Sequence, residues 1–70
     1  MTPYDINNIP TELGTYALTI KQTDSLIKRH MIAKLQYNKL LHRNDFYHDD
    51  PAIKMPIAPR FIESYIKLDE

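Results

Sequence analysis

Side chains that pair with phosphates and with base edges are concentrated in the middle third of this 70-residue chain. Residues 21–43 contain six Lys and Arg side chains and one acid, although the whole chain has a net charge of zero. Lys, Arg, Asn and Gln are the residue types that hydrogen-bond to phosphate oxygens and to bases. The residues that we expect to contact nucleic acid are Lys28, Arg29, Lys34, Gln36, Asn38, Lys39, Arg43 and Lys54.

Two aromatic residues, Phe46 and Tyr47, follow the basic stretch within the segment "HRNDFYHDD". Large aromatic side chains at a surface anchor protein–protein contacts, so we expect these two to bind a larger protein partner. The same segment places histidines and carboxylates at short intervals, which are ligand types for a metal ion. Short clusters of this kind arise often by chance, so we predict neither a metal nor a cofactor. The cluster consists of His42, Asp45, His48 and Asp49.

No motif in the chain indicates catalysis. A glycine-rich phosphate loop and a nucleophile elbow are both absent from the sequence, which contains one glycine and no cysteine. A domain of this size also has little room for an enclosed active-site pocket. We therefore predict that the protein is not an enzyme and has no small-molecule substrate. Without an apolar run of membrane-spanning length or a signal-peptide pattern, we expect it to be cytoplasmic and to have no membrane partner.

The distribution of prolines and glycine divides the chain into an arm and a domain. Residues 1–12, with two prolines and two adjacent asparagines, are predicted to be an N-terminal arm, and residues 13–70 a single domain. From Ile20 to Asn44 there is neither Gly nor Pro, and helix-forming residues dominate. The apolar side chains change face near residues 28–32, which favours two helices, with one long helix as the alternative.

A third helix is predicted after Pro59. The segment "RFIESYIKL" carries a continuous apolar stripe at helical spacing, and proline is favoured at the first position of a helix. Asp49, Asp50 and Pro51 indicate a turn, while "TYAL" after Gly14 and "AIKM" at residues 52–55 indicate short strands. The predicted class is therefore α+β and mainly helical, with three helices and one or two short strands.

The segments "LTIKQTDSLI" and "IAPRFIESYI", separated by a basic helix and a strand-bearing loop, resemble the small winged-helix domains of excisionases and MerR-type proteins over about residues 17–66. The resemblance implies a winged helix-turn-helix fold and a non-catalytic DNA-binding protein that serves a mobile genetic element. The chain departs from the pattern in two places. The predicted inter-helix turn lacks a small residue, and the loop lacks a basic, glycine-rich tip.

Two functions are consistent with these observations. The first is an accessory protein that binds DNA, as a duplex or a single strand, and works with a larger recombinase, polymerase or primase in DNA recombination or replication. The second is a protein-interaction module or inhibitor that binds no nucleic acid. For the first function, zero net charge indicates a modest affinity for nucleic acid, or help from another protein.

Overall fold

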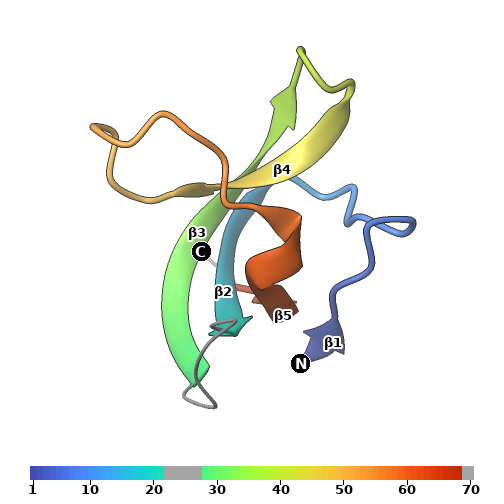
Figure 1. Cartoon of the computed structure of the whole chain (residues 1–70), viewed down its shortest axis with the longest axis vertical. Helices are drawn as coiled ribbons and strands as arrows, with labels where there is room; N and C mark the ends of the chain where they lie inside the picture. Colours follow the sequence, from blue (N-terminus) through green and yellow to red (C-terminus); the bar gives the residue numbers. More distant parts are fainter. Residues whose placement is uncertain (22–27, 69–70) are drawn as a thin grey trace.

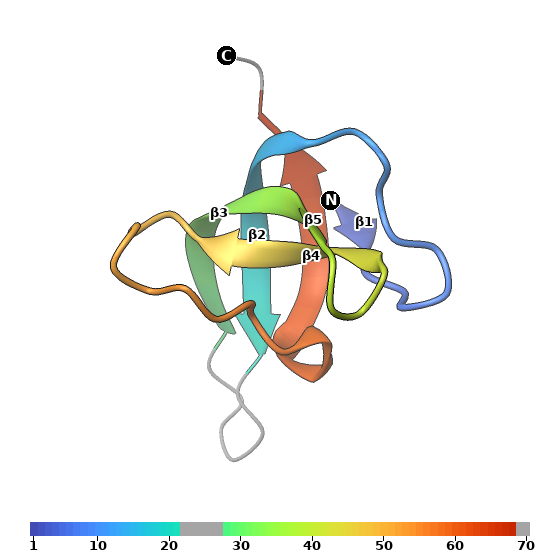
Figure 2. The ribbon, with the colours of Figure 1, turned by 90° about the horizontal axis from the view of Figure 1, so that it is seen from above.

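The structure, a computed structural model, describes residues 1–21 and 28–68. The described residues form one five-stranded antiparallel sheet with strand order β1-β5-β2-β3-β4. The sheet is bent strongly around its own core, and the chain returns from β4 to β5 through a long loop and one turn of 3-10 helix (Figure 1, Figure 2). The elements are β1 (Thr2–Pro3), β2 (Gly14–Lys21), β3 (Lys28–Asn38), β4 (Arg43–His48), η1 (Pro59–Phe61) and β5 (Ile62–Lys67).

The predicted mainly helical, winged helix-turn-helix class is wrong, because the described residues contain no α-helix. No described helix has the length and apolar character needed to cross a bilayer.

The region predicted as one or two helices is divided between β2, β3 and β4. In β3, Ala33 and Leu35 are buried, whereas Lys34 and Gln36, which alternate with them, are exposed. This alternation has the period of two that places successive side chains on opposite faces of a strand. Pairing with β2 on one side and β4 on the other overrides the helix propensity of the Lys, Leu and Gln residues. Leu26 and Ile27, which belong to the first predicted helix, lie outside the described residues.

The third predicted helix is also wrong, and a β-bulge explains why its pattern is helical. Residues 59–61 form η1, and residues 62–67 form β5. Along β5, Ile62 pairs with Ile20 and Tyr65 pairs with Leu18, with a register shift between the two pairs. The extra residue in the bulge separates two inward-facing side chains by three positions instead of two. That spacing imitates one turn of an amphipathic helix.

Of the two short strands predicted from the sequence, one is confirmed. "TYAL" lies within β2, but residues 52–55 form a turn and irregular backbone. The turn at Asp49–Pro51 is also confirmed, since the Asp50 side chain accepts a hydrogen bond from the amide of Ala52 at 2.9 Å. The loop then returns to β4, where Ile57 N donates to Phe46 O at 2.7 Å.

The core fills the concave side of the bent sheet. Phe46 is 1% exposed, and its ring centroid lies 5.2 Å from that of Tyr16 and 5.9 Å from that of Tyr65. Edge-on and tilted contacts at these distances are the favoured arrangements of aromatic rings. The N-terminal arm adds Tyr4 and Ile9 to the margin of this cluster. The buried apolar residues are Tyr16, Leu18, Ala33, Leu35, Phe46, Ile57 and Ile62.

Candidate nucleic-acid interface

The face of the sheet that points away from the core brings several of the predicted binding residues together. Register pairs Thr15 of β2 with Lys34 of β3, and Lys34 in turn with Tyr47 of β4. Side chains paired across adjacent strands lie on the same face, so these three form one row. Gln36 is the next residue of β3 on that face and is exposed. We call this side of β2, β3 and β4 the outer face.

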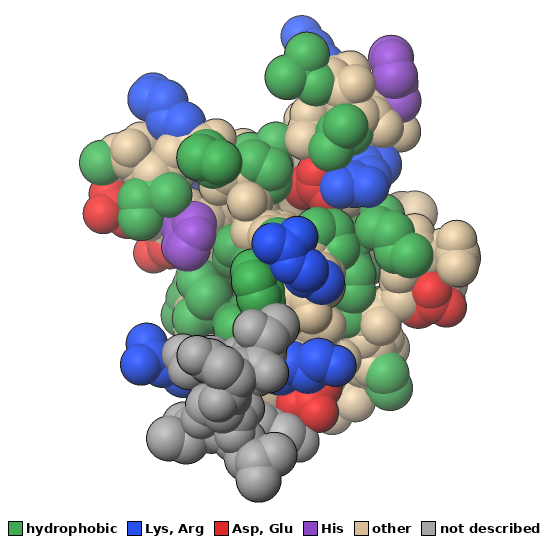
Figure 3. Space-filling view, viewed as in Figure 1, with side chains coloured by type: hydrophobic (Ala, Val, Ile, Leu, Met, Phe, Trp, Pro, Cys, Tyr) green, Lys and Arg blue, Asp and Glu red, His purple; other side chains and the backbone are tan. Residues whose placement is uncertain are grey.

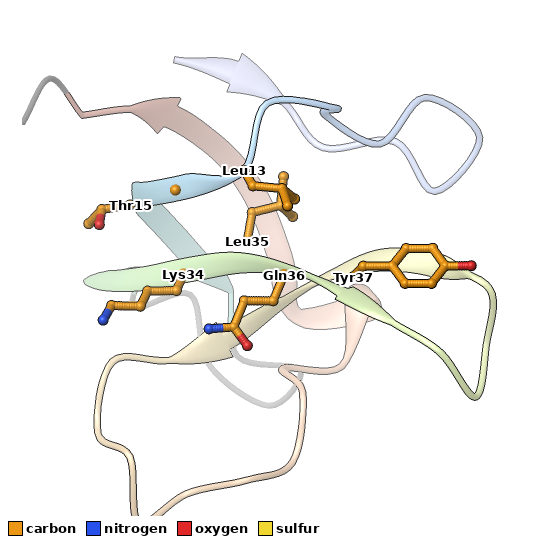
Figure 4. A pocket seen from close by; sticks show the side chains of 7 residues that line it. Leu13, Thr15, Lys34, Leu35, Gln36 and Tyr37 are labelled. Carbon is orange, nitrogen blue, oxygen red and sulfur yellow. The ribbon is translucent and has the colours of Figure 1, made fainter.

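A shallow depression of about 360 Å³ adjoins this row on the β2 side. Lys34 and Gln36 project to the same side of β3, while Leu35 points to the other side and the Tyr37 ring extends away along the strand (Figure 4). Thr15 and Gly14 close the depression from β2.

A second depression, of about 230 Å³, lies on the β4 side of the same residues. Gln36 and Tyr47 line it together with Lys54, which reaches it from the loop that follows β4. The fold therefore assembles three residues predicted to contact nucleic acid, and one predicted to bind a protein partner, around a pair of adjoining depressions. These four are Lys34, Gln36, Tyr47 and Lys54, and we call them the outer-face site.

Carboxylates moderate the charge of the outer-face site. Lys34 Nζ lies 3.8 Å from Asp49 Oδ1, with the two side chains 49% and 57% exposed. An exposed pair at this distance contributes about 0–1 kcal/mol, so an anionic ligand can displace it at little cost. Asp50 also lines the second depression. Two cations beside two acids predict weak attraction for phosphate, so stacking and hydrogen bonding must supply part of any affinity.

More positive side chains lie at the far end of β2 and β3. Lys21 and Arg29 are exposed there, and the Thr19 hydroxyl is 3.3 Å from Nδ1 of His30. Register places Lys28 opposite Lys21, although the side chain of Lys28 lies outside the described part of the structure. Among the described residues, neither Lys21 nor Arg29 forms an ion pair.

Three predicted residues are occupied by contacts within the protein, although the Arg43 side chain is still 33% exposed. Asp45, which is 1% exposed, accepts hydrogen bonds from Asn38 Nδ2 at 2.9 Å and from Arg43 Nε at 3.0 Å. The Asn38 side-chain oxygen also accepts from the backbone amide of Leu40 at 3.0 Å, which stabilises the turn between β3 and β4. Phe46 is part of the core and has no surface for a partner. We therefore leave Asn38, Arg43 and Phe46 out of the binding surface.

Lys39 is exposed in the β3–β4 turn, beyond the end of both depressions. On the side of the molecule seen in Figure 3, Lys and Arg side chains stand apart from one another and do not form a continuous patch. The cations that lie close together in the sequence are therefore distributed over several parts of the fold, with Lys34 on the outer face, Lys39 in the β3–β4 turn, and Lys21 and Arg29 at the far end of β2 and β3.

The His and Asp residues of "HRNDFYHDD" are dispersed by the fold. Asp45 is buried against Asn38, Asp49 pairs with Lys34, and His48 lines a groove beside Ile20 and Met31. No group of three His, Asp or Glu side chains in the described part of the chain is placed to hold a metal ion.

No protein family, characterised protein or solved structure matches this chain. The suggested relationship to excisionases and MerR-type proteins has no support from these comparisons, and the all-β fold contradicts it.

Sequence reasoning missed Thr15, Gly14 and Tyr37 as neighbours of the predicted residues. A period of two in "MIAKLQ" could have indicated that Lys34 and Gln36 share a face. The pairing of that strand with residues 14–21 depends on tertiary structure and leaves no local signal.

Proposed function

We propose that this protein is a non-catalytic accessory protein that contacts single-stranded nucleic acid through its outer-face site. The observation that carries the proposal is the placement of Lys34, Gln36, Tyr47 and Lys54 around two adjoining depressions. Cations beside an aromatic side chain on a sheet surface suit a strand whose phosphates are neutralised and whose bases stack. A duplex is less suitable, because the surface offers no helix or ribbon for the major groove.

The expected affinity is weak. Two cations flanked by Asp49 and Asp50 supply little net charge, so we expect Kd values near the non-specific range, on the order of 10⁻⁵ M at physiological salt. Such affinity is useful to a protein that is held near its nucleic acid by a larger partner. A recombinase, polymerase or primase of a mobile element stays our prediction for that partner, and the neighbouring genes would test it.

Fluorescence titration of a labelled single strand at several salt concentrations tests the proposal. Exchanging both Lys34 and Lys54 for Ala should weaken binding and reduce the slope of log affinity against log salt by about 1.4, because each phosphate contact on a single strand contributes about 0.7. Arg60→Gln is the matched control, since Arg60 is exposed beside Phe61 and lines neither depression. An unchanged slope in the double variant would contradict the proposal.

A change at Asp49 should act in the opposite direction. Asp49→Asn removes the carboxylate that pairs with Lys34, so single-strand binding should become about two- to fivefold tighter, as expected for a surface charge pair. Tighter binding by Asp49→Asn together with weaker binding by Lys34→Ala would assign the interaction to this position. Equal affinity of all variants would exclude it.

A protein-interaction module without nucleic-acid binding is the second candidate. It is favoured by the apolar groove beside Met31 and by the exposure of Met55, which is 75% accessible. Absence of any shift of a single strand or a duplex at low ionic strength would favour this candidate.

A further inference from the structure

One edge of the sheet is only half used. β3 has 11 residues, whereas its neighbour β4 has six and pairs only with residues 33–38 of β3. Among the described residues, no strand pairs with residues 28–32 of β3 on this side. The lower half of β3 accordingly forms a free edge in both ribbon views (Figure 1, Figure 2). Backbone donors and acceptors along such an edge can pair with another strand.

An apolar groove of about 590 Å³ adjoins this free edge. Ile20 and Met31 line it from the sheet, and Ile53, Met55 and Phe61 line it from the loop and η1. Hydrophobic side chains gather beneath the 49–58 loop in the space-filling view (Figure 3). Met55 is 75% exposed and Ile53 is 44% exposed, which leaves a contiguous apolar surface of the kind that marks interaction sites.

The position of the groove relative to the edge matches the geometry of strand addition. A strand paired with residues 28–32 would lie in line with β4, beyond its last residue, His48. Every second side chain of that strand would face the same side as Met31 and enter the groove, while the others would face solvent. Main-chain hydrogen bonds would supply the pairing, and the groove would supply the selection for apolar side chains.

Charge indicates which strand fits. Register places Lys21 on the face opposite Met31, which is the face that the solvent-facing side chains of an added strand would share, and Arg29 is exposed on the free edge. No acidic side chain is among the described residues that line the groove. A second copy of this chain would bring two runs of Lys28, Arg29 and His30 together, and like charges across paired strands are destabilising. An acidic strand would instead place opposite charges across the paired strands, which is stabilising.

We propose that residues 28–32 of β3 accept an extended peptide segment of a partner protein, rich in acidic residues alternating with apolar ones, as an additional strand. This surface lies beside the inner face of the sheet and includes neither Lys34 nor Lys54, although it shares His48 and Ile53 with the second depression. The proposal therefore goes beyond nucleic-acid contact.

The test uses the full chain and a fluorescently labelled peptide in which Val and Ile alternate with Asp and Glu. The matched peptides carry Lys in place of the acids, or N-methyl groups on alternate backbone amides. We expect the acidic peptide to bind and to protect backbone amides within residues 29–32 from hydrogen exchange. The basic peptide and the N-methylated peptide should bind at least about tenfold more weakly, because the first loses charge complementarity and the second loses its backbone donors.

Substitutions in the chain test whether peptide binding depends on the groove or on exposed apolar side chains in general. Met55→Glu places a charge in the groove at a side chain that is already exposed, so the fold should be retained and peptide binding should fall at least about tenfold. Leu40→Glu is the matched control, because Leu40 is 91% exposed and does not line the groove. Met55→Gln removes the apolar side chain without adding a charge beside Lys54. This variant and Leu40→Glu should bind a single-stranded oligonucleotide as the parent does, which distinguishes failure of this proposal from failure of the outer-face proposal.

Three results would overturn the inference. The acidic peptide could fail to bind, or the N-methylated peptide could bind equally well, which would exclude backbone pairing. Alternatively, the chain alone could form dimers with protection confined to residues 29–32, which would make a second copy the occupant.

Discussion

At the scale of single residues, the most constrained polar group is the carboxylate of Asp45. It is 1% exposed and accepts hydrogen bonds from Asn38 and Arg43, so its charge is compensated within the β3–β4 hairpin. A buried carboxylate is tolerated only when it is paired and hydrogen-bonded. Asn38 and Arg43 are therefore structural residues, although both belong to types that commonly bind nucleic acid.

Asp45→Ala should destabilise the protein by about 2–3 kcal/mol, because it leaves the buried Asn38 amide without its acceptor and Arg43 without its partner. The free energy of unfolding from urea titration measures the effect. Lys34→Ala removes an exposed ion pair and should change the same quantity by less than about 1 kcal/mol. Equal losses in the two variants would show that the buried network is not the source of stability.

At the scale of secondary-structure elements, the start of β2 depends on the backbone conformation of Gly14. Its φ of +140° lies in a region that side-chain-bearing residues rarely adopt. A Cβ added at this position would also lie 2.9 Å from Cε of Lys67, although that flexible side chain can move. Gly14 also lines the depression beside Lys34, so the conformation affects both the fold and the outer face.

Gly14→Ala should cost about 1–3 kcal/mol of stability, mainly through the unfavourable φ. Thermal and urea unfolding would measure the loss. Thr15→Ala at the next position is the control, because its backbone needs no positive φ. A stability of Gly14→Ala equal to that of the parent would mean that the β2 backbone relaxes without cost.

At the scale of the whole molecule, the N-terminal arm is held against the bent sheet by tyrosines. The Tyr16 hydroxyl donates to the backbone carbonyl of Glu12, and the Tyr4 ring contacts both Phe46 and Tyr65. Burial is the main cause that raises the pKa of Tyr4 and of Tyr16 above the ordinary value of 10.0, with nearby Asp45 adding to the effect at Tyr4.

These shifts predict a loss of stability at alkaline pH. Because the folded-state pKa values are raised, the unfolded chain releases the phenolic protons first as pH rises. The contribution of these two tyrosines to the free energy of unfolding is therefore fully present below pH 10.0 and is lost as pH rises above it. Tyr4→Phe keeps the ring and removes one ionising group, and should therefore make the decline of the unfolding free energy above pH 10.0 less steep. An identical decline in parent and variant would contradict a contribution from Tyr4.

The sequence was sufficient for features that depend on composition or on a few adjacent residues. These include the zero net charge, the turn at Asp50 and Pro51 and the strand containing "TYAL". Helix propensity and the absence of Gly and Pro between Ile20 and Asn44 led to the wrong class. Local propensity is a small free-energy preference that strand pairing readily overrides.

Tertiary structure alone decided which residues share a surface. The bulge beside Ile62 gives a strand the apolar spacing of a helix, and pairs such as Thr2 with Tyr65 join opposite ends of the chain. Lys54 reaches Gln36 and Tyr47 only because the loop after β4 folds back. Sheet pairing is set by contacts between segments that are distant in sequence, so the grouping of the proposed binding residues on either face could not be obtained from local patterns.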